Sequence, residues 1–271
     1  MKHRSTWWKT ALGLVFTALM LFPVYWMVNI SFTQRQAIRS GDLYPRQFTL
    51  ENYATVLNDQ LPYLATSLVI ALSCVALTLL IAMPSSYALA ILWKNKSQGL
   101  NFALVIVQMI PAVVMALGFY QIFDNLGLLN NLFGLILADT TIAVPFAVML
   151  LSSFMAGMPQ SLIEAAKIDG ASNWKIFTTV VVPLSRNSVV TVSLFAFLWG
   201  WSDFMFASTL NSGGGLLRPI TMGIYDYIGA QNQEWGPMMA TAVIASVPTA
   251  MLLIIAQKYV AAGVTAGAIK D

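Results

Sequence analysis

Charged side chains are scarce in this sequence, since Lys, Arg, Asp and Glu make up 9% of its 271 residues, whereas hydrophobic residues make up 58%. A soluble domain carries about 25% charged residues. The composition therefore excludes an ordinary soluble protein and indicates an integral membrane protein. The formal net charge of +3 is small, and no basic cluster is interleaved with aromatic residues. Nucleic-acid partners are therefore excluded as well.

Cysteine and histidine each occur once, as Cys74 and His3. A single cysteine inside an apolar segment excludes an intrachain disulfide and a cysteine-based zinc site. A single histidine in a basic stretch excludes an H-E-x-x-H zinc motif and a Ser-His-Asp triad. The P-loop pattern G-x-x-x-x-G-K-[ST] is also missing, because the glycines at residues 213–215 lack the following lysine. We therefore expect no catalytic residue, no metal site and no cofactor bound by this chain.

Six apolar segments are each long enough to cross the hydrocarbon core as a helix, which takes about 20 residues. They cover residues 10–30, 64–92, 100–123, 132–155, 189–210 and 237–257. The first is longer than the apolar core of a signal peptide, about 7–15 residues, so we expect a retained helix. Prolines in these segments predict bent helices in a packed bundle around a cavity: Pro23, Pro84, Pro111, Pro145 and Pro248.

The placement of Lys and Arg predicts the orientation in the membrane. With a cytoplasmic N-terminus, ten of the 14 basic residues lie inside and four, Arg35, Arg39, Arg46 and Arg218, lie outside. Both termini are then cytoplasmic. The predicted organisation is an N-terminal tail (1–9), a transmembrane domain (10–260) with a cytoplasmic loop (157–187) and extracytoplasmic loops (31–63, 124–131 and 211–236), and a C-terminal tail (261–271).

Residues 161–183 form a polar, charged stretch between two apolar segments. Ser161 and Glu164 fit a capping box, which predicts that a helix begins at Leu162. Gly170 is expected to end this helix in the left-handed conformation. A small, weakly apolar surface is expected on this helix, formed by Ile163, Ala165 and Ala166.

A second short helix is predicted after Gly170. Ser172 can cap a helix that runs from Asn173 towards Val182, and Pro183 is expected to limit it. An ordered, capped loop of this kind favours a docking site over an ordinary connecting loop.

The spacing of this loop resembles a family motif. Residues 164–183 read Glu-Ala-Ala, three residues, Gly170, nine residues, Val180, one residue, Val182 and Pro183. This is similar to the E-A-A-x3-G-x9-I-x-L-P motif of ABC importer permeases, with valines in place of the usual Ile and Leu. In that family the loop sits in a cleft of the ATPase subunit. The resemblance implies contact with the ATPase for Glu164, Ala165, Ala166, Asp169, Gly170 and Pro183.

Three further stretches carry the resemblance. Residues 48–53 resemble a segment of sugar-importer permeases, and residues 197–207 resemble the W-N-[DE]-F-L-F-A signature, with Ser202 in place of Asn. Residues 257–270 are similar to the C-terminal ending of carbohydrate importers of the maltose type. That ending implies tail contacts with the ATPase through Gly263, Thr265 and Gly267.

The resemblance implies an all-α, six-helix transmembrane domain of a type I ABC importer for a di- or oligosaccharide or a related carbohydrate. It implies a bacterial inner-membrane protein that pairs with a second permease subunit, two ATPase subunits and an extracytoplasmic sugar-binding protein. ATP and Mg²⁺ would then bind to the ATPase. The main alternative is a self-sufficient secondary carrier, which would usually show paired repeats and buried carboxylates in helix centres. A membrane scaffold would need neither the capped loop nor the tail.

Carboxylates within apolar segments are costly and are candidates for function. Asp139 could meet a sugar hydroxyl or a water-filled cavity, or it could be an interfacial residue that caps a helix beginning after it. Asp203 lies beside Trp199 and Trp201, a pairing that suits a sugar path, although the family signature favours a structural or gating role. Gln108 is a further path candidate, with a hydrogen bond between helices as the alternative.

Overall fold

The computed structural model describes residues 7–93, 97–213, 217–229 and 233–268, and these residues are helical apart from turns, loops and two isolated β-bridges. The all-α prediction is confirmed over this part of the chain. Within it, four helices are long and apolar enough to cross a membrane, or up to six if each of two bent helix pairs is one span. The chain divides into two compact units, each described separately below.

Unit 1 comprises residues 1–61 and 223–247. Its helices are α1 (Trp7–Ser31), the 3-10 helix η1 (Ile38–Ser40), the first turns of α2 (Glu51–Tyr87), the 3-10 helix η5 (Ile224–Tyr227) and the first part of α12 (Trp235–Ala268). Val56, Tyr227 and Ala240 form its small apolar core. Burial beside Asp59 raises the pKa of the Tyr227 hydroxyl, which donates to the Asp59 carboxylate at 3.3 Å.

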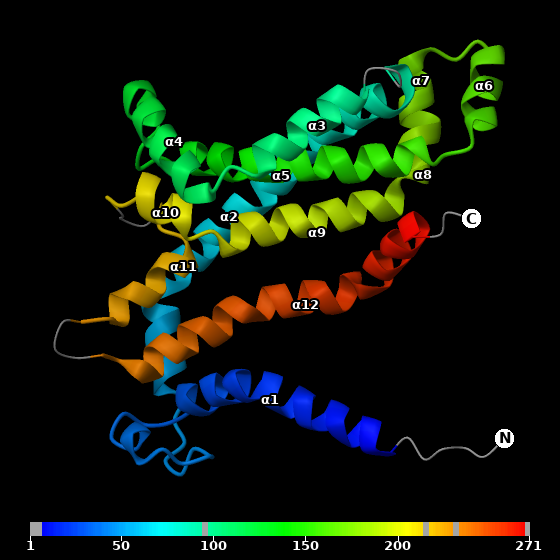
Figure 1. Ribbon diagram of the computed structural model, residues 1–271. Coiled ribbons are helices and arrows are strands. Elements are labelled where there is room, and N and C mark those ends of the chain that lie inside the picture. The colour runs from blue at the N-terminus through cyan, green and yellow to red at the C-terminus, as the bar shows by residue number, and fades with distance from the viewer. Residues whose placement is uncertain (1–6, 94–96, 214–216, 230–232, 269–271) are drawn as a thin grey trace. The chain divides into compact units, whose positions relative to one another are not determined.

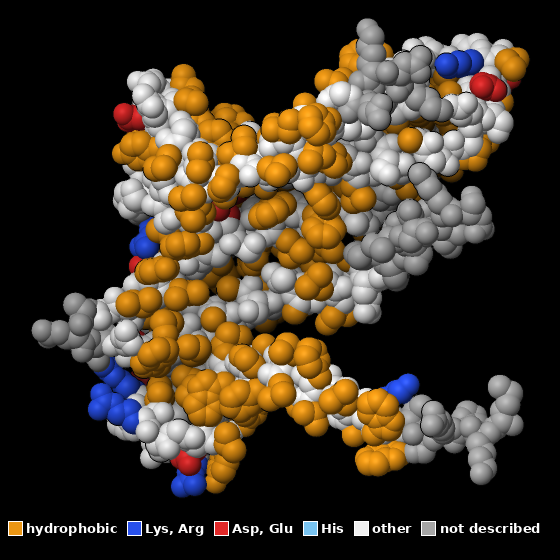
Figure 2. Space-filling model, in the orientation of Figure 1, with side chains coloured by type: hydrophobic (Ala, Val, Ile, Leu, Met, Phe, Trp, Pro, Cys, Tyr) orange, Lys and Arg blue, Asp and Glu red, His pale blue; other side chains and the backbone are white. Residues whose placement is uncertain are grey.

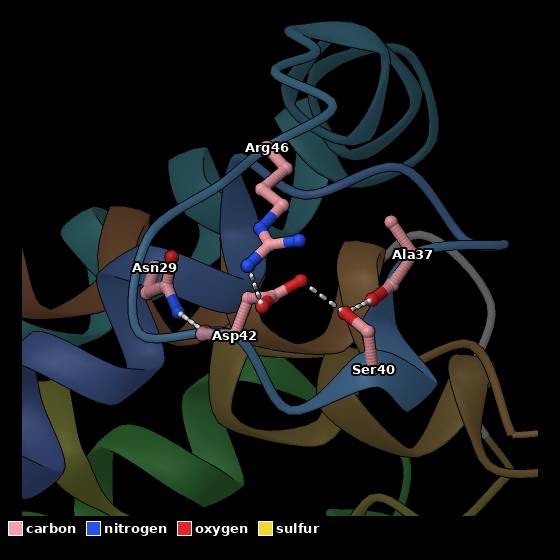
Figure 3. Close-up of polar contacts among 5 residues, drawn as sticks. All are labelled: Asn29, Ala37, Ser40, Asp42 and Arg46. Atoms are coloured by element: carbon pink, nitrogen blue, oxygen red, sulfur yellow. Dashed lines mark hydrogen bonds and ion pairs between the residues drawn. The ribbon is translucent and has the colours of Figure 1, made fainter.

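The segment that connects α1 to α2 is held by one carboxylate (Figure 3). The side chain of Asp42 accepts a hydrogen bond from the Ser40 hydroxyl at 2.6 Å and pairs with the Arg46 guanidinium at 3.1 Å. Its backbone carbonyl accepts from the Asn29 side chain at 2.9 Å. This extracytoplasmic loop of the predicted topology is therefore folded onto the end of α1.

Helix α2 begins at Glu51, whereas the sequence predicted a polar loop up to residue 63. Two polar side chains explain the error. Asn52 is buried and donates to the carbonyls of Ser31 and Thr33. Gln60 is fully buried, donates to the carbonyl of Gly223 at 2.7 Å and accepts from the Thr241 hydroxyl. These bonds offset the cost of burying amides, which hydropathy alone counts as loop residues.

Unit 2 comprises residues 62–222 and 248–271. After the rest of α2 come the π-helix η2 (Ala88–Leu92), α3 (Ser97–Gln108), α4 (Ala112–Leu126), α5 (Leu132–Ala156), α6 (Gln160–Ile168), α7 (Asn173–Ile176), the π-helix η3 (Phe177–Val181), α8 (Val182–Leu184), α9 (Arg186–Ser202), α10 (Met205–Leu210) and α11 (Ile220–Gly223). Helices α5 and α9 lie side by side, and α6 and α7 project beyond the end of α5 (Figure 1).

Small residues bring the unit 2 helices together, as is common in membrane bundles. A Cβ at Gly200 of α9 would lie 3.1 Å from the Ala71 Cα and 3.2 Å from the Cys74 Cβ on α2. Ala143 of α5 and Ala196 of α9 are buried in the same cluster. Along α5, two larger apolar clusters flank Ala143, one around Leu135 and one around Leu151.

The prolines do not act alike. Pro111 follows a true break, since Gly99–Gln108 and Ala112–Leu126 meet at 90°. Pro145, in contrast, lies inside the continuous helix α5 and does not interrupt it. The fifth apolar segment is divided between α9 and α10, and α12 continues through most of the predicted C-terminal tail.

Candidate coupling loop and translocation surface

The first helix of the candidate loop, α6, begins at Gln160. The N-cap is Pro159, and no side chain caps the helix, so the predicted capping box is wrong. Ser161 is already helical because the amide of Leu162 donates to the carbonyl of Pro159 at 3.2 Å. Glu164 therefore stabilises no cap, and its carboxylate is exposed.

The end of α6 is as predicted. Gly170 has φ +78°, the left-handed conformation in which glycine meets no steric penalty. The amide of Gly170 donates to Lys167 and that of Ala171 donates to Ala166, each at 3.0 Å. This pair of bonds is a Schellman motif, which satisfies the last carbonyls of the helix.

The second helix also begins as predicted, because the Ser172 hydroxyl accepts from the amide of Lys175 at 3.3 Å. It does not end at Pro183. The chain passes through the π-helix η3 and then α8, with Pro183 in the first turn of α8, where its missing N–H costs little. The bend comes one residue after Leu184, where Asn173–Leu184 and Arg186–Ser202 meet at 78°.

The loop has one buried face and one exposed face. Ile163, Ile176 and Phe177 are buried in the unit 2 core, and the Phe177 ring lies 5.3 Å from that of Tyr87 at the end of α2. Ile163 therefore does not belong to an exposed surface, contrary to the prediction. Large apolar side chains point outward instead at Ile168, 86% exposed, and Trp174, 70% exposed.

The exposed face carries most of the residues that the family motif marks. These are Glu164, Ala165, Asp169, Gly170 and Pro183, while Ala166 is half-buried. A small basic patch and a small acidic patch lie next to each other at this end of unit 2, and hydrophobic side chains cover much of the helices beyond it (Figure 2). Gly263, Thr265 and Gly267 lie in the last turns of α12, and their side chains are outside the described part of the structure.

Asp139 lies inside the bundle. Helix α5 begins at Leu132 with Asn131 as its cap, so Asp139 does not cap a later start, and that alternative is wrong. The side chain is 3% exposed, and one carboxylate oxygen has no hydrogen-bond partner among the described residues. It lies close enough to Asp203 for the two carboxylates to interact electrostatically.

Asp203 caps a helix. Its two carboxylate oxygens accept from the amides of Phe206 at 3.1 Å and Ala207 at 2.9 Å, at the start of α10. Its backbone carbonyl accepts from the Thr221 hydroxyl at 2.6 Å. Trp201 is buried and stacks on Phe197 at 5.6 Å. These contacts favour the structural alternative for Asp203.

Gln108, the fourth path candidate, lines a cavity. The cavity has a volume of about 330 Å³ and lies where α3 and α4 meet. Its walls also include Thr141, Pro145 and Phe146 of α5 and Trp199 of α9. The Gln108 amide donates to the Met149 sulfur at 2.9 Å, the hydrogen bond between helices that was the alternative for this residue.

The sequence interpretation placed Trp199 beside Asp203 on a sugar path and did not predict the cavity at the break between α3 and α4. The signal was present, because Pro111 and Pro145 both mark backbone carbonyls that lose a donor within the membrane. The sequence could not show that the two prolines line one cavity, since 34 positions separate them along the chain.

Comparisons with known proteins agree with this architecture. Residues 96–266 match the family described as "Binding-protein-dependent transport system inner membrane component". The sulfoquinovosyl glycerol transport system permease protein SmoH of Agrobacterium fabrum is 35% identical, over 92% of this chain and 89% of its own length. The trehalose/maltose transport system permease protein MalG of Thermococcus litoralis is 30% identical, over 96% and 95% respectively.

Solved structures support the same fold. A chain of a bacterial ABC transporter involved in the import of the acidic polysaccharide alginate superposes with a TM-score of 0.82, covering 96% of this chain and 99% of that chain at 20% identity. A chain of the MetNI methionine ABC transporter superposes with a TM-score of 0.59 over 80% of this chain. This chain therefore has the type I ABC importer permease fold, as the sequence motifs indicated.

Proposed function

Because the chain belongs to the family of inner-membrane components of binding-protein-dependent transport systems, we propose that it forms half of the translocation path of a carbohydrate importer. Members of this family are ABC transporter permeases, which are transport components rather than enzymes. The proposed cargo is a di- or oligosaccharide or a related carbohydrate. The relatives named for trehalose, maltose and diacetylchitobiose support it.

The proposed assembly contains a second permease subunit, two ATPase subunits that bind ATP and Mg²⁺, and an extracytoplasmic sugar-binding protein. A related alginate transporter has been solved with its periplasmic protein bound, which supports the last of these. The proposed location is a bacterial inner membrane, with six spans and both termini in the cytoplasm. In this proposal each of the two bent helix pairs would be one span, which adds two spans to the four long apolar helices.

One observation carries the coupling proposal, namely that Ile168 and Trp174 are exposed on a loop whose other face is buried in the unit 2 core. Exposed aromatic and aliphatic anchors that rise from an ordered scaffold are typical of protein–protein hot spots. The proposed receptor is an apolar cleft of the ATPase subunit, with the carboxylates of Glu164 and Asp169 at its rim.

The buried face of the loop would transmit movement of the ATPase to the transmembrane helices. ATP binding would close the ATPase dimer and move the docked loop with it. Since Ile163 and Phe177 are packed in the unit 2 core and Phe177 contacts Tyr87, this movement would rotate α2 and α5 rather than bend the loop alone. Such rigid-body rotation would switch the access of the path between the two sides of the membrane.

Affinity purification of the tagged chain in mild detergent, followed by mass spectrometry, tests the assembly. We expect a second polytopic subunit and a P-loop ATPase with the wild type. Ile168→Ser and Trp174→Ala should lose the ATPase but keep the second membrane subunit. Leu126→Ser is the matched control, because Leu126 is 64% exposed and lies in the predicted extracytoplasmic loop 124–131, on the side of the membrane away from the ATPase. A chain that purifies alone and transports after reconstitution would support the secondary carrier instead.

Substitutions at the family motif sharpen this test. Gly170→Val should abolish uptake, because the left-handed conformation costs a residue with a Cβ about 1–2 kcal/mol and β-branching adds to it. Glu164→Lys reverses an exposed charge without disturbing a cap and should weaken ATPase retention. Gly118→Ala is the control, since Gly118 lies inside α4 with open space around it. Wild-type uptake and ATPase retention in both motif variants would contradict the coupling proposal.

A further inference from the structure

The cavity at the α3–α4 break contains polar groups that a lipid-facing surface would not leave open. The indole N–H of Trp199 and the side-chain carbonyl of Gln108 have no hydrogen-bond partner among the described residues. Pro145 has no N–H to donate to the carbonyl of Thr141, and both residues line the cavity. Unsatisfied polar groups in hydrocarbon cost several kcal/mol each, so irregular backbone at this depth is tolerated where it lines a wet or ligand-filled space.

The wall of the cavity bears no charged side chain. Its polar members are Gln108, Thr141 and Trp199, and its apolar members include Phe146 and Pro111. A carboxylate or sulfonate entering here would lose its hydration without gaining a cationic partner, which is unfavourable. A neutral ligand with hydroxyl groups loses less, because the amide, the indole and the backbone carbonyl offer both donors and acceptors.

Size and shape restrict the occupant further. A volume of about 330 Å³ is near the lower end of the roughly 300–1,000 Å³ typical of small-molecule sites. Trp199 is 48% exposed, so part of its ring is available for contact. An aromatic ring packs well against the C–H face of a pyranose, while the equatorial hydroxyls of the sugar reach polar groups around the edge of the ring.

We propose that this cavity is a transit site for one uncharged sugar ring, with Trp199 as the stacking platform and Gln108 and the Thr141 carbonyl as hydroxyl partners. The proposal rests on the proposed function and narrows its cargo to neutral carbohydrates. It also assigns substrate contact to this chain, independently of the second permease subunit. Asp139, Trp201 and Asp203 are then supports of the bundle and do not contact the sugar.

Cysteine accessibility tests the cavity directly, because the only native thiol, Cys74, is fully buried. Met109→Cys places a thiol in the cavity wall, and Leu80→Cys places an equally exposed thiol on α2, since these side chains are 75% and 72% exposed. In the purified complex in lipid nanodiscs, a charged methanethiosulfonate reagent should modify Met109→Cys faster than Leu80→Cys, on the order of tenfold. Equal rates would mean a lipid-facing surface, and no labelling of Met109→Cys would mean a cavity closed by another subunit. Either result overturns the proposal.

Protection by sugars tests the ligand class. Millimolar maltose or trehalose should slow the labelling of Met109→Cys, and digalacturonate, an acidic disaccharide, should not. Adding Trp199→Leu should remove the protection, Trp199→Phe should retain part of it, and Trp93→Leu, outside the cavity, should leave it unchanged. Protection by neither neutral sugar, or equal protection by the acidic one, would overturn the proposal. Absence of the ATPase from the same purified complex would be a separate result, which contradicts the proposed function.

Discussion

Two apolar stretches of unit 2 are interrupted, one between α3 and α4 and one between α9 and α10. At the second break the carboxylate of Asp203 accepts from two amides of α10, and its carbonyl accepts from Thr221. At the first break no side chain caps the start of α4, and a cavity lies there instead.

The difference shows how to distinguish a structural interruption from a functional one. Every helix end leaves backbone groups without helical partners. Where a side chain of the same chain satisfies them, as Asp203 does, the break is closed and can be buried. Where polar groups stay open around a space, water or a ligand has to complete them.

The largest effect on stability is expected when the hydrogen bonds that Asp203 makes at the break between α9 and α10 are removed. Asp203→Ala removes both hydrogen bonds to α10, a loss comparable to that of a helix cap, about 0.5–2 kcal/mol. The variant should assemble poorly and lose its folded state at a lower temperature, as measured by fluorescence-detected size exclusion after heating. Asp203→Asn keeps one acceptor oxygen, so its melting temperature should lie between those of the wild type and Asp203→Ala. A melting temperature for Asp203→Ala equal to that of the wild type would contradict the capping role.

An intermediate effect is expected when one of the polar groups around the cavity at the α3–α4 break is given a hydrogen-bond partner within the chain. Pro145→Ala restores an N–H that can donate to the Thr141 carbonyl within α5. The variant should be more heat-stable than the wild type but slower in uptake, because a hydroxyl partner of the cavity is then occupied. Pro248→Ala in α12 is the control, since Pro248 does not line the cavity. Increased stability with unchanged uptake would show that the Thr141 carbonyl does not bind the sugar.

The smallest effect is expected at Asp139, which lies near the closed break. Asp139→Asn replaces a buried carboxyl group beside Asp203, one oxygen of which has no partner among the described residues, with a neutral amide. A modest gain in thermal stability, about 1 kcal/mol or less, should follow, with uptake unchanged. Asp124→Asn, an exposed carboxylate at the end of α4, should change neither. Loss of uptake in Asp139→Asn would return Asp139 to the substrate path.

Two local backbone signals in the sequence were reliable, whereas a third, the capping box of Ser161 and Glu164, was wrong. Gly170 ends α6 and Ser172 begins α7 because each acts through its own backbone conformation or a bond three residues away. The exposed face of α6 was not predictable in the same way. Whether Ile163 or Ile168 points outward depends on how the helix rests on the unit 2 core, and this is a tertiary property.

Prolines and buried amides limited the prediction of the helices. Pro111 and Pro145 lie in similar apolar sequence, yet only Pro111 follows a break. Many α5 residues around Pro145 are buried against neighbouring helices, whereas those around Pro111 are largely exposed, so packing holds one helix together and not the other. Likewise, Gln60 can be buried in a helix because it forms hydrogen bonds with Gly223 and Thr241, about 160 and 180 positions away along the chain. No local sequence pattern reveals such partners.

The two π-helical segments, η2 and η3, adjoin at the contact between Tyr87 and Phe177. A π-turn holds one more residue than an α-turn, and π-turns often mark functional positions. Each segment therefore contains one residue more than an α-helix of the same length, at the point where the loop joins the bundle. If the π-turn moved along the helix by exchanging one hydrogen-bond partner at a time, the helix on one side of it would gain a residue and the helix on the other side would lose one. Nearly all backbone hydrogen bonds would stay formed during this movement.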